Sequence, residues 1–434
     1  MMSRFGRWLG VILVSLHVSQ IAVAGELMAV YRQALENAPV LKAAAAERLA
    51  KQEILPQSRA LWLPRLNLNA SVATNRRDPK VGPVDEYQSQ GYGLSITQSL
   101  YNRANWVLLE QAKEQVGQAD ANYDAAEQSL MLEVTQRYFD VLAALDTLGF
   151  TQAEKAAIER QLQQAQQRFE VGVSAITDVQ EARARYDSVV SREITAHNQL
   201  DSAREALQEL TGSANMELNP LSAGFPLQLP DPNDIERWER IARENNPQLK
   251  AARYALHVAE KDIIRQSAAR YPSLNLVGSY QRSEAGSLQF VDNDLTAITL
   301  QLELPLYQGG GISSRTRQAR HRYQQANEEL EKMLRSTLRM TRDAFRGVLA
   351  GIAHVQALEQ ALASSQTALK ATEAGFEVGT RTIVDVLNVQ QELFRVKRDH
   401  AVARYNYLLA MLRLKQVAGI LQAADLEEVS RWTR

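Results

Sequence analysis

The side chains that most often carry enzyme chemistry are sparse in this sequence. It has no cysteine, and the histidines beyond residue 24 stand alone at positions 197, 257, 321, 354 and 400, with no pair at metal-ligand spacing. Gly309, Gly310 and Gly311 lie between a predicted strand and a predicted helix, as in a phosphate-binding loop, but no Gly-Lys-Ser or Gly-Lys-Thr follows them. The sequence therefore predicts a protein that is not an enzyme and has no cofactor or metal site.

Arg381 and Asp385 are charged residues whose spacing allows an electrostatic interaction. They lie four positions apart on a predicted helix, so they can form a local ion pair worth a few tenths of a kcal/mol. An acid on such a helix is otherwise simply solvated. If identical chains meet around a symmetry axis, however, copies of Asp385 gather, and they then repel one another or bind cations. The elements that hold these residues decide between the two roles.

Those elements occur twice along the chain. Asn37-Ala38-Pro39 returns as Asn245-Asn246-Pro247, at an offset of 208 (247 − 39), and Pro64 to Leu68 returns as Pro272 to Leu276 at the same offset (272 − 64). Farther on, Phe169 to Gly172 returns as Phe376 to Gly379, at an offset of 207 (376 − 169). This period exceeds the roughly 20 to 50 residues of solenoid repeats, so we infer one duplicated unit.

The amino terminus predicts export. Arg4 and Arg7 precede a short apolar stretch, and Ala22-Val23-Ala24 forms a cleavage site, so residues 1–24 read as a cleaved signal peptide. An uncleaved membrane helix is the alternative, but the apolar stretch is shorter than the ~20 residues that a span needs. Cleavage removes two arginines and no acid, which moves the net charge from −1 to −3 (−1 − 2) and argues against nucleic acid as a partner.

Two pairs of segments, at 66–72 with 92–100 and at 274–280 with 298–306, alternate between apolar and polar residues as β-strands do. Each is about 9 to 11 residues long, which suits a tilted strand that crosses a bilayer. A soluble, half-buried sheet shows the same alternation. Amphipathic rings near the strand ends favour the membrane; they are Trp62, Tyr92, Tyr101, Tyr271, Tyr280 and Tyr307.

The same alternation assigns faces and loops to these strands. We expect Leu300, Leu302 and Leu304 to face lipid, and Thr299, Gln301 and Glu303 to face the lumen. The polar stretches 75–90 and 283–294 are expected to be extracellular loops. Four strands leave unpaired edges that cost several kcal/mol per group in lipid, so one chain cannot close a barrel and self-association is required.

Each strand pair precedes a long proline-free segment, at 103–170 and at 312–377, predicted as helices of roughly 100 Å. Gly172 and Gly379 are expected to end them, and returning helices follow at 176–210 and 383–417. Shorter helices, at 27–60 and 235–269, open the two copies. The predicted organisation is a signal peptide at 1–24, a first repeat at 25–211, a linker at 212–234, a second repeat at 235–420 and a tail at 421–434.

Four motifs resemble the TolC family of outer-membrane efflux and secretion ducts, across nearly the whole mature chain. They are Arg168 to Gln180, Leu304 to Gly310, Val378 to Leu387 and Ala403 to Tyr407. The resemblance implies a mainly α-helical fold with a membrane β part. In that fold, three protomers with four strands each form an α-helical barrel continuous with a twelve-stranded transmembrane β-barrel.

The resemblance also implies a function. The homotrimer would be a channel-tunnel in contact with outer-membrane lipid. It would work with a periplasmic adaptor (membrane fusion) protein and an inner-membrane ABC or RND-type transporter. It would carry proteins by type I secretion, small molecules by multidrug efflux, or both, across the periplasm and outer membrane. The alternative from another class is a periplasmic coiled-coil adaptor.

The family pattern implies a closed periplasmic gate at the helix tips. Carried over to this chain, Arg381 of one protomer links to Thr177 and Asp178 of its neighbour, Gln161 links to Glu373, and Asp385 forms an acid ring. Two positions depart from the pattern. Asn388 stands where relatives have a second acid, and Phe376 stands where they have a tyrosine, so a weaker ring and one missing hydrogen bond are expected. The tip residues expected to bind the adaptor are Val171, Gly172, Val173, Val378, Gly379 and Thr380.

Overall fold

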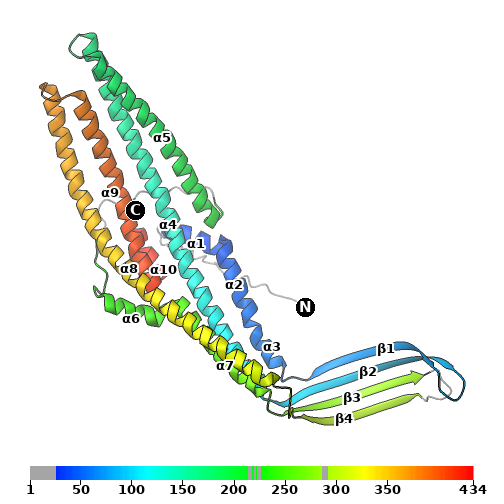
Figure 1. Cartoon of the computed structure of the whole chain (residues 1–434). Coiled ribbons are helices and arrows are strands. Elements are labelled where there is room, and N and C mark those ends of the chain that lie inside the picture. Colours follow the sequence, from blue (N-terminus) through cyan, green and yellow to red (C-terminus); the bar gives the residue numbers. More distant parts are fainter. Residues whose placement is uncertain (1–25, 214–217, 219–220, 222–225, 286–291, 434) are drawn as a thin grey trace, which may run out of the picture.

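The structure is a computed structural model that describes residues 26–213, 218, 221, 226–285 and 292–433. The predicted signal peptide lies outside the described residues, as does part of the predicted linker. The protomer is elongated, with a β-sheet at one end and two helical hairpin tips at the other (Figure 1). Within the described residues, no helix is both long enough and apolar enough to cross a membrane.

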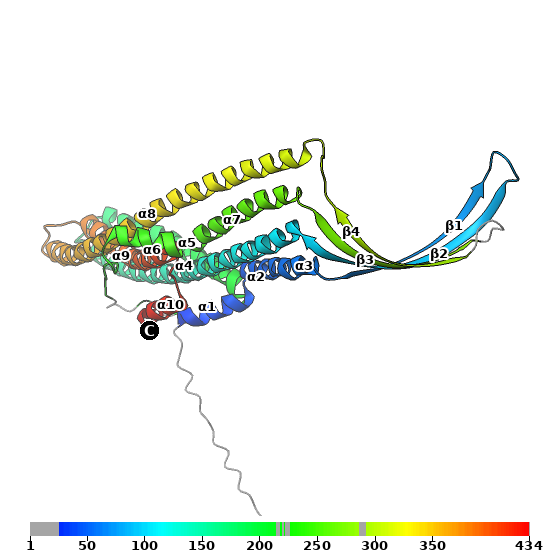
Figure 2. The same cartoon turned by 90° about the horizontal axis from the view of Figure 1, so that it is seen from below.

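Two helices run the length of the helical part, α4 (Arg103–Glu170) and α8 (Gly311–Glu377). In the half next to the sheet they are accompanied by α2 (Pro39–Gln52), α3 (Ile54–Ala60) and α7 (Pro247–Ala268), so that α2–α3, α4, α7 and α8 form a row (Figure 2). In the half next to the tips, the returning helices α5 (Ile176–Thr211) and α9 (Ile383–Ala418) pack against α4 and α8. The predicted long and returning helices are confirmed to within one residue.

The opening helices are broken where the sequence suggested continuous segments. Pro39 begins α2 after α1 (Glu26–Asn37), and Pro247 begins α7 after α6 (Ile235–Asn245). Proline suits a first helical turn but not an interior, because it lacks the amide hydrogen. The predicted tail contains α10 (Ala423–Ser430) and the short helix η1 (Arg431–Thr433). In α10, Leu426 is fully buried in the main core beside α1.

The sheet has the order β1-β2-β3-β4, with all neighbours antiparallel. The strands are β1 (Arg65–Arg77), β2 (Asp85–Asn102), β3 (Ser273–Ala285) and β4 (Asn293–Glu303). At 13, 18 and 13 residues, the first three exceed the predicted length. The expected loop at 75–90 was therefore wrong: strand pairing continues through its polar residues and leaves only 78–84 as the connection. Polar alternation persists beyond the apolar band, so composition alone misplaced the strand ends.

The register collects apolar side chains on one face, as predicted. Leu66 lies opposite Ile96, Leu276 opposite Leu300, and Leu274 opposite Leu302. A bulge between Ser99 and Tyr101 shifts the end of β2. Ile298 is 82% exposed and Leu302 is 68% exposed in the protomer. An apolar face this open is typical of a surface covered by lipid.

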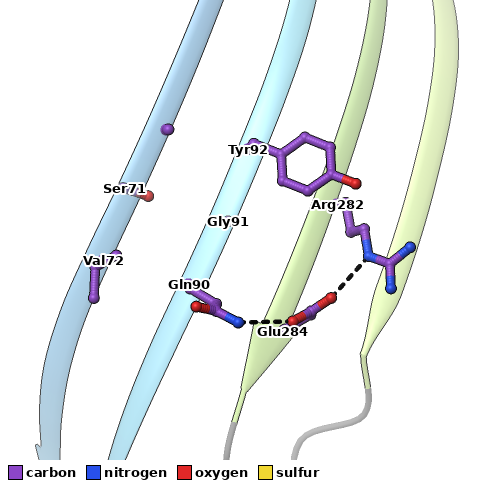
Figure 3. Close-up of a pocket in the computed structure, with 8 residues that line it drawn as sticks. Ser71, Val72, Gln90, Gly91, Tyr92, Arg282 and Glu284 are labelled. Atoms are coloured by element: carbon purple, nitrogen blue, oxygen red, sulfur yellow. Dashed lines mark hydrogen bonds and ion pairs between the residues drawn. The ribbon is translucent and has the colours of Figure 1, made fainter.

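The same face turns polar toward the strand connections. Gln90 Nε2 donates to Glu284 (2.8 Å), and Arg282 Nε donates to the other oxygen of that carboxylate (2.9 Å), next to Tyr92 (Figure 3). These residues line a pocket of about 420 Å³. Because charged groups avoid hydrocarbon, this ladder marks the distal limit of the apolar band.

Candidate gate at the helix tips

Both hairpin tips are built from the same turn. Gly172 (φ 76°) and Gly379 (φ 81°) take the left-handed conformation that ends a helix. After α4, the amide of Val173 donates to the carbonyl of Arg168 (2.8 Å); after α8, the amide of Thr380 donates to the carbonyl of Gly375 (2.8 Å). The two turns therefore have the same geometry, and the two glycines end their helices as the sequence predicted.

The tips present apolar side chains to solvent. Val171, Val173 and Val378 are 74%, 67% and 76% exposed, respectively. Behind them, a small core made of α4, α5 and α9 residues holds the hairpins together; its fully buried members include Ile158, Ala182, Ile383 and Leu387. Exposed valines on a firmly packed turn form the kind of surface that a protein partner covers.

Asp385 forms a capping box with Thr382 at the start of α9. Its carboxylate accepts hydrogen bonds from the amide (2.9 Å) and the hydroxyl (3.0 Å) of Thr382, while the Thr382 hydroxyl accepts from the Asp385 amide (3.2 Å). These bonds, together with the charge of Arg381, hold the pKa of Asp385 below its usual value. Asp385 is thus ionised at neutral pH and positioned at the start of α9.

Phe376 is anchored by a contact that the sequence did not predict. The guanidinium carbon of Arg168 lies 4.7 Å from the centre of the Phe376 ring, and the ring packs on the small tip core. A cation over an aromatic face is worth about 0.5–1 kcal/mol at an exposed site. Phenylalanine therefore still links the tip of α4 to that of α8, through its ring face in place of a hydroxyl.

Asn388 is held by an arginine of the other repeat. Arg185 on α5 donates to the Asn388 side-chain oxygen (2.6 Å) and to Gln391 (2.9 Å), both on α9. The sequence predicted a weaker acid ring because position 388 has no carboxylate. The structure also places a cation, Arg185, next to this position. Sequence reasoning missed Arg168 and Arg185 because their partners lie about 200 residues away and no local pattern marks them.

The other predicted gate residues do not meet within one protomer. Among the described residues, Arg381 makes no ion pair with Asp178, and Gln161 makes no hydrogen bond with Glu373. Arg381 and Thr177 are exposed, and the side-chain oxygen of Gln161 is buried without a hydrogen-bond partner. These residues were assigned to contacts between protomers, so their roles stay predictions.

One buried charge cluster lies farther from the tip. Glu154 on α4 is fully buried and accepts from Arg192 on α5 (2.8 Å) and from Arg398 on α9 (3.2 Å). Removing one partner of such a cluster leaves an uncompensated charge, so it holds three helices in one arrangement. In the described part of the chain, no three His, Asp or Glu side chains are grouped to hold a metal ion.

The Tyr405 and Tyr407 motif is structural. The Tyr405 hydroxyl donates to Asp146 on α4 (2.8 Å), and the Tyr407 hydroxyl donates to the carbonyl of Gln228 (2.9 Å) and accepts from its amide (2.8 Å). Burial is the main cause that raises the pKa of Asp146 above its usual value. These bonds tie α9 to the first repeat and to the segment between the repeats.

Known proteins are similar to this chain in sequence and in fold. TolC of Vibrio cholerae is 39% identical over 412 residues, covering 94% of this chain and 93% of the relative. The alkaline protease secretion protein AprF of Pseudomonas aeruginosa is 30% identical, covering 99% and 91%. The crystal structure of the outer membrane protein VceC from Vibrio cholerae superposes with a TM-score of 0.79 at 20% identity, covering 91% of this chain and 96% of VceC, which shows the fold.

A family model covers both repeats separately. The model described as outer membrane efflux protein matches residues 30–213 and 238–420. These two segments correspond to the two structural repeats, and the strand pairs and hairpin tips fall inside them. The chain therefore belongs to the outer membrane efflux protein family and resides in the outer membrane.

Proposed function

We propose that three copies of this chain form a channel-tunnel that carries substrates, chemically unchanged, across the periplasm and the outer membrane. Each protomer would contribute four strands to a twelve-stranded barrel and its long helices to a helical barrel below it. Relatives include an alkaline protease secretion protein, and the family is one of efflux proteins. Type I protein secretion and multidrug efflux are accordingly the two transport routes that we assign to it.

The open sheet is the observation that carries this proposal. β1 and β4 are edge strands, each paired on one side only in the described protomer, and the apolar face between them is exposed. In lipid, unpaired strand edges cost several kcal/mol per group, so the sheet must close with other copies. The helices that continue from it reach about 100 Å, because α4 has 68 residues at 1.5 Å each.

The same observation weighs against the adaptor alternative, which requires a soluble β-domain. A soluble domain buries its apolar sheet face, whereas Ile298 and Leu302 stand open here. We assign the adaptor a partner role instead. The exposed valines at the two tips, with Gly172, Gly379 and Thr380, would receive the hairpin of a periplasmic adaptor, which in turn recruits an ABC or RND-type inner-membrane transporter.

The tips would also be the resting gate. Arg381 is exposed one turn from the capped Asp385, so its guanidinium is available to Thr177 and Asp178 of a neighbouring protomer. Gln161 and Glu373 would add a second link, and three copies of Asp385 would gather at the axis. Arg168 with Phe376 and Arg185 with Asn388 would hold the hairpins of one protomer together.

Electron microscopy of the purified, detergent-solubilised protein tests this function. We expect a trimeric particle about 140 Å long, from the ~100 Å helical section plus a barrel with ~30 Å of hydrocarbon span and its loops. Insertion of the same sample into planar bilayers should give discrete conductance steps. A monomeric particle that never conducts would contradict the proposal.

A further inference from the structure

The first three turns of α8 carry an exposed cluster of arginines that the proposed gate does not use. Arg315, Arg317, Arg320 and Arg322 are all exposed, and none has an ion pair or hydrogen bond within the described part of the chain. His321 lies among them, and no acidic residue occurs between Glu303 and Glu328. We call these four side chains the arginine collar.

The arginine collar lies directly beside the apolar end of the sheet. The segment that joins β4 to α8 exposes Leu306 (89%) and Tyr307 (86%), and Trp106 is exposed at the corresponding junction of β2 with α4. Exposed aromatic and aliphatic side chains next to a transmembrane strand mark the membrane–water interface. With α8 beginning at Gly311 and rising 1.5 Å per residue, all four arginines lie within roughly 20 Å of that interface.

The equivalent turns of the first repeat have no such charge. Residues 103–114 of α4 contain two basic and two acidic residues, and both acids are paired: Glu110 with Lys261 (2.8 Å) and Glu114 with His257 (3.2 Å). Helix formation and packing against α7 therefore do not require the arginines. The excess positive charge is particular to the second repeat.

A neighbouring copy of the chain does not offer enough opposite charge. The row α2–α3, α4, α7, α8 has free sides at its two ends, so α8 would meet α2–α3 of the next protomer (Figure 2). At this level that edge offers Glu53 together with Arg59, which adds no net negative charge. The arginine collar thus needs a partner of another kind.

We propose that the arginine collar binds the anionic headgroups of phospholipids in the periplasmic leaflet of the outer membrane. Clustered arginines beside a transmembrane segment attract anionic lipid electrostatically, and each arginine adds to the free energy of binding. A pocket of about 370 Å³ adjoins the arginine collar, lined by Arg270, Leu304, Leu306, Tyr307 and Ser313 among others. Arg270 donates to Ser313 there (3.3 Å), so the pocket combines a cation with apolar walls, as a lipid glycerophosphate requires.

The four arginines divide into two pairs by helix geometry. Arg315 and Arg322 are seven residues apart and share one side of α8, whereas Arg317 and Arg320 share another. In a closed helical barrel only the outward side reaches lipid. One pair should therefore account for most of the lipid binding.

The test is native mass spectrometry of the full mature trimer, titrated with phosphatidylglycerol or with neutral phosphatidylcholine. The variants are Arg315→Gln with Arg322→Gln, and Arg317→Gln with Arg320→Gln. We expect one of them to lower the preference for phosphatidylglycerol by about ten-fold. The matched control, Arg346→Gln with Lys370→Gln, removes two exposed cations of α8 that lie far from the sheet and have no ion pair among the described residues, and it should keep the wild-type preference.

Replacing the same pair by lysines should preserve the preference, because charge is retained, and this variant keeps the test decisive if a glutamine variant fails to assemble. Wild-type preference in both glutamine variants would overturn the inference. So would a change in ion selectivity alone, which would place the arginines in the lumen, or loss of trimers in neutral lipid, which would place them between protomers. The inference rests on the proposed channel: a wild type that never inserts contradicts the channel itself, whereas one that inserts without lipid preference contradicts only the arginine collar.

Discussion

At the helix tips, the gate that we propose depends on single side chains. Arg381 is exposed, and the carboxylate of Asp385, four residues along, already accepts two hydrogen bonds from Thr382. Its guanidinium is therefore free to reach a neighbouring protomer. A charge-assisted hydrogen bond contributes about 1.5–3 kcal/mol, so three symmetric bonds can shift the equilibrium by several kcal/mol.

We therefore expect Arg381→Ala to conduct far more than the wild type in planar bilayers. Arg183→Ala is the control, because Arg183 is an exposed arginine near the tip of the other hairpin, with no ion pair among the described residues. It should conduct as the wild type does. Equal conductance of the Arg381 variant and the wild type would remove Arg381 from the gate.

Position 388 gives a second prediction at this scale. Because Arg185 already contacts the Asn388 oxygen at 2.6 Å, Asn388→Asp should form an ion pair between α5 and α9. Such a partly exposed pair contributes about 0.2–1 kcal/mol. The variant should open less often than the wild type, and the effect should vanish when Arg185→Gln is added. An effect that persists without Arg185 would show that the new carboxylate acts on the pore directly.

Residue roles were predictable from the sequence where they depend on local geometry. The glycines of the two tips were identified because only a left-handed residue ends a helix in that way. The contacts of Arg168 with Phe376 and of Arg185 with Asn388 join residues about 200 positions apart, and nothing in the neighbouring sequence specifies them. The departures at positions 376 and 388 were recognised, but their replacement contacts required the fold.

At the scale of elements, an asparagine near the start of each repeat bonds to the end of the returning helix of the same repeat. In the first, the Asn37 side chain donates to the carbonyl of Thr211 at the end of α5 (2.8 Å). In the second, Asn246 donates to the carbonyl of Val417 near the end of α9 (2.8 Å). Long helices were predictable to within a residue because they contain no proline and a glycine marks the carboxyl end of each. Strand ends were not, because polar residues continue the pairing beyond the apolar band.

The glycines that end the returning helices should differ in their tolerance of a side chain. Gly212 (φ 70°) and Gly419 (φ 75°) are both left-handed, but an added Cβ would lie 3.6 Å from Asn37 in one case and 2.5 Å from the backbone of Asn245 in the other. Gly212→Ala should cost about 1–2 kcal/mol of stability from backbone strain alone. Gly419→Ala adds a clash with backbone, worth roughly 1–3 kcal/mol more. The temperature at which trimers dissociate should thus fall further for Gly419→Ala, and equal losses would contradict the close approach.

At the scale of the whole molecule, the sheet face and the helices together place the protein across the outer membrane. The apolar band begins beside Tyr307 and ends at the polar ladder of Gln90, Glu284 and Arg282. Along β4 it runs through Leu302, Leu300 and Ile298. The alternation predicted these faces, but the depth of each residue follows only from the paired register, which sets Ile298 nearer the middle of the band than Leu306.

The depth assignment leads to a graded prediction for assembly. An arginine on the lipid face costs about 2–4 kcal/mol at the bilayer midplane and about 0–1 kcal/mol near an interface. Ile298→Arg should therefore impair trimer assembly in vesicles more than Leu306→Arg, which lies beyond the end of β4, beside Tyr307. Thr299→Arg points to the opposite face and is the matched control, since it should assemble normally and alter only conductance. If Ile298→Arg and Thr299→Arg assembled equally well, the strand register would be displaced by one residue, because that shift exchanges the two faces.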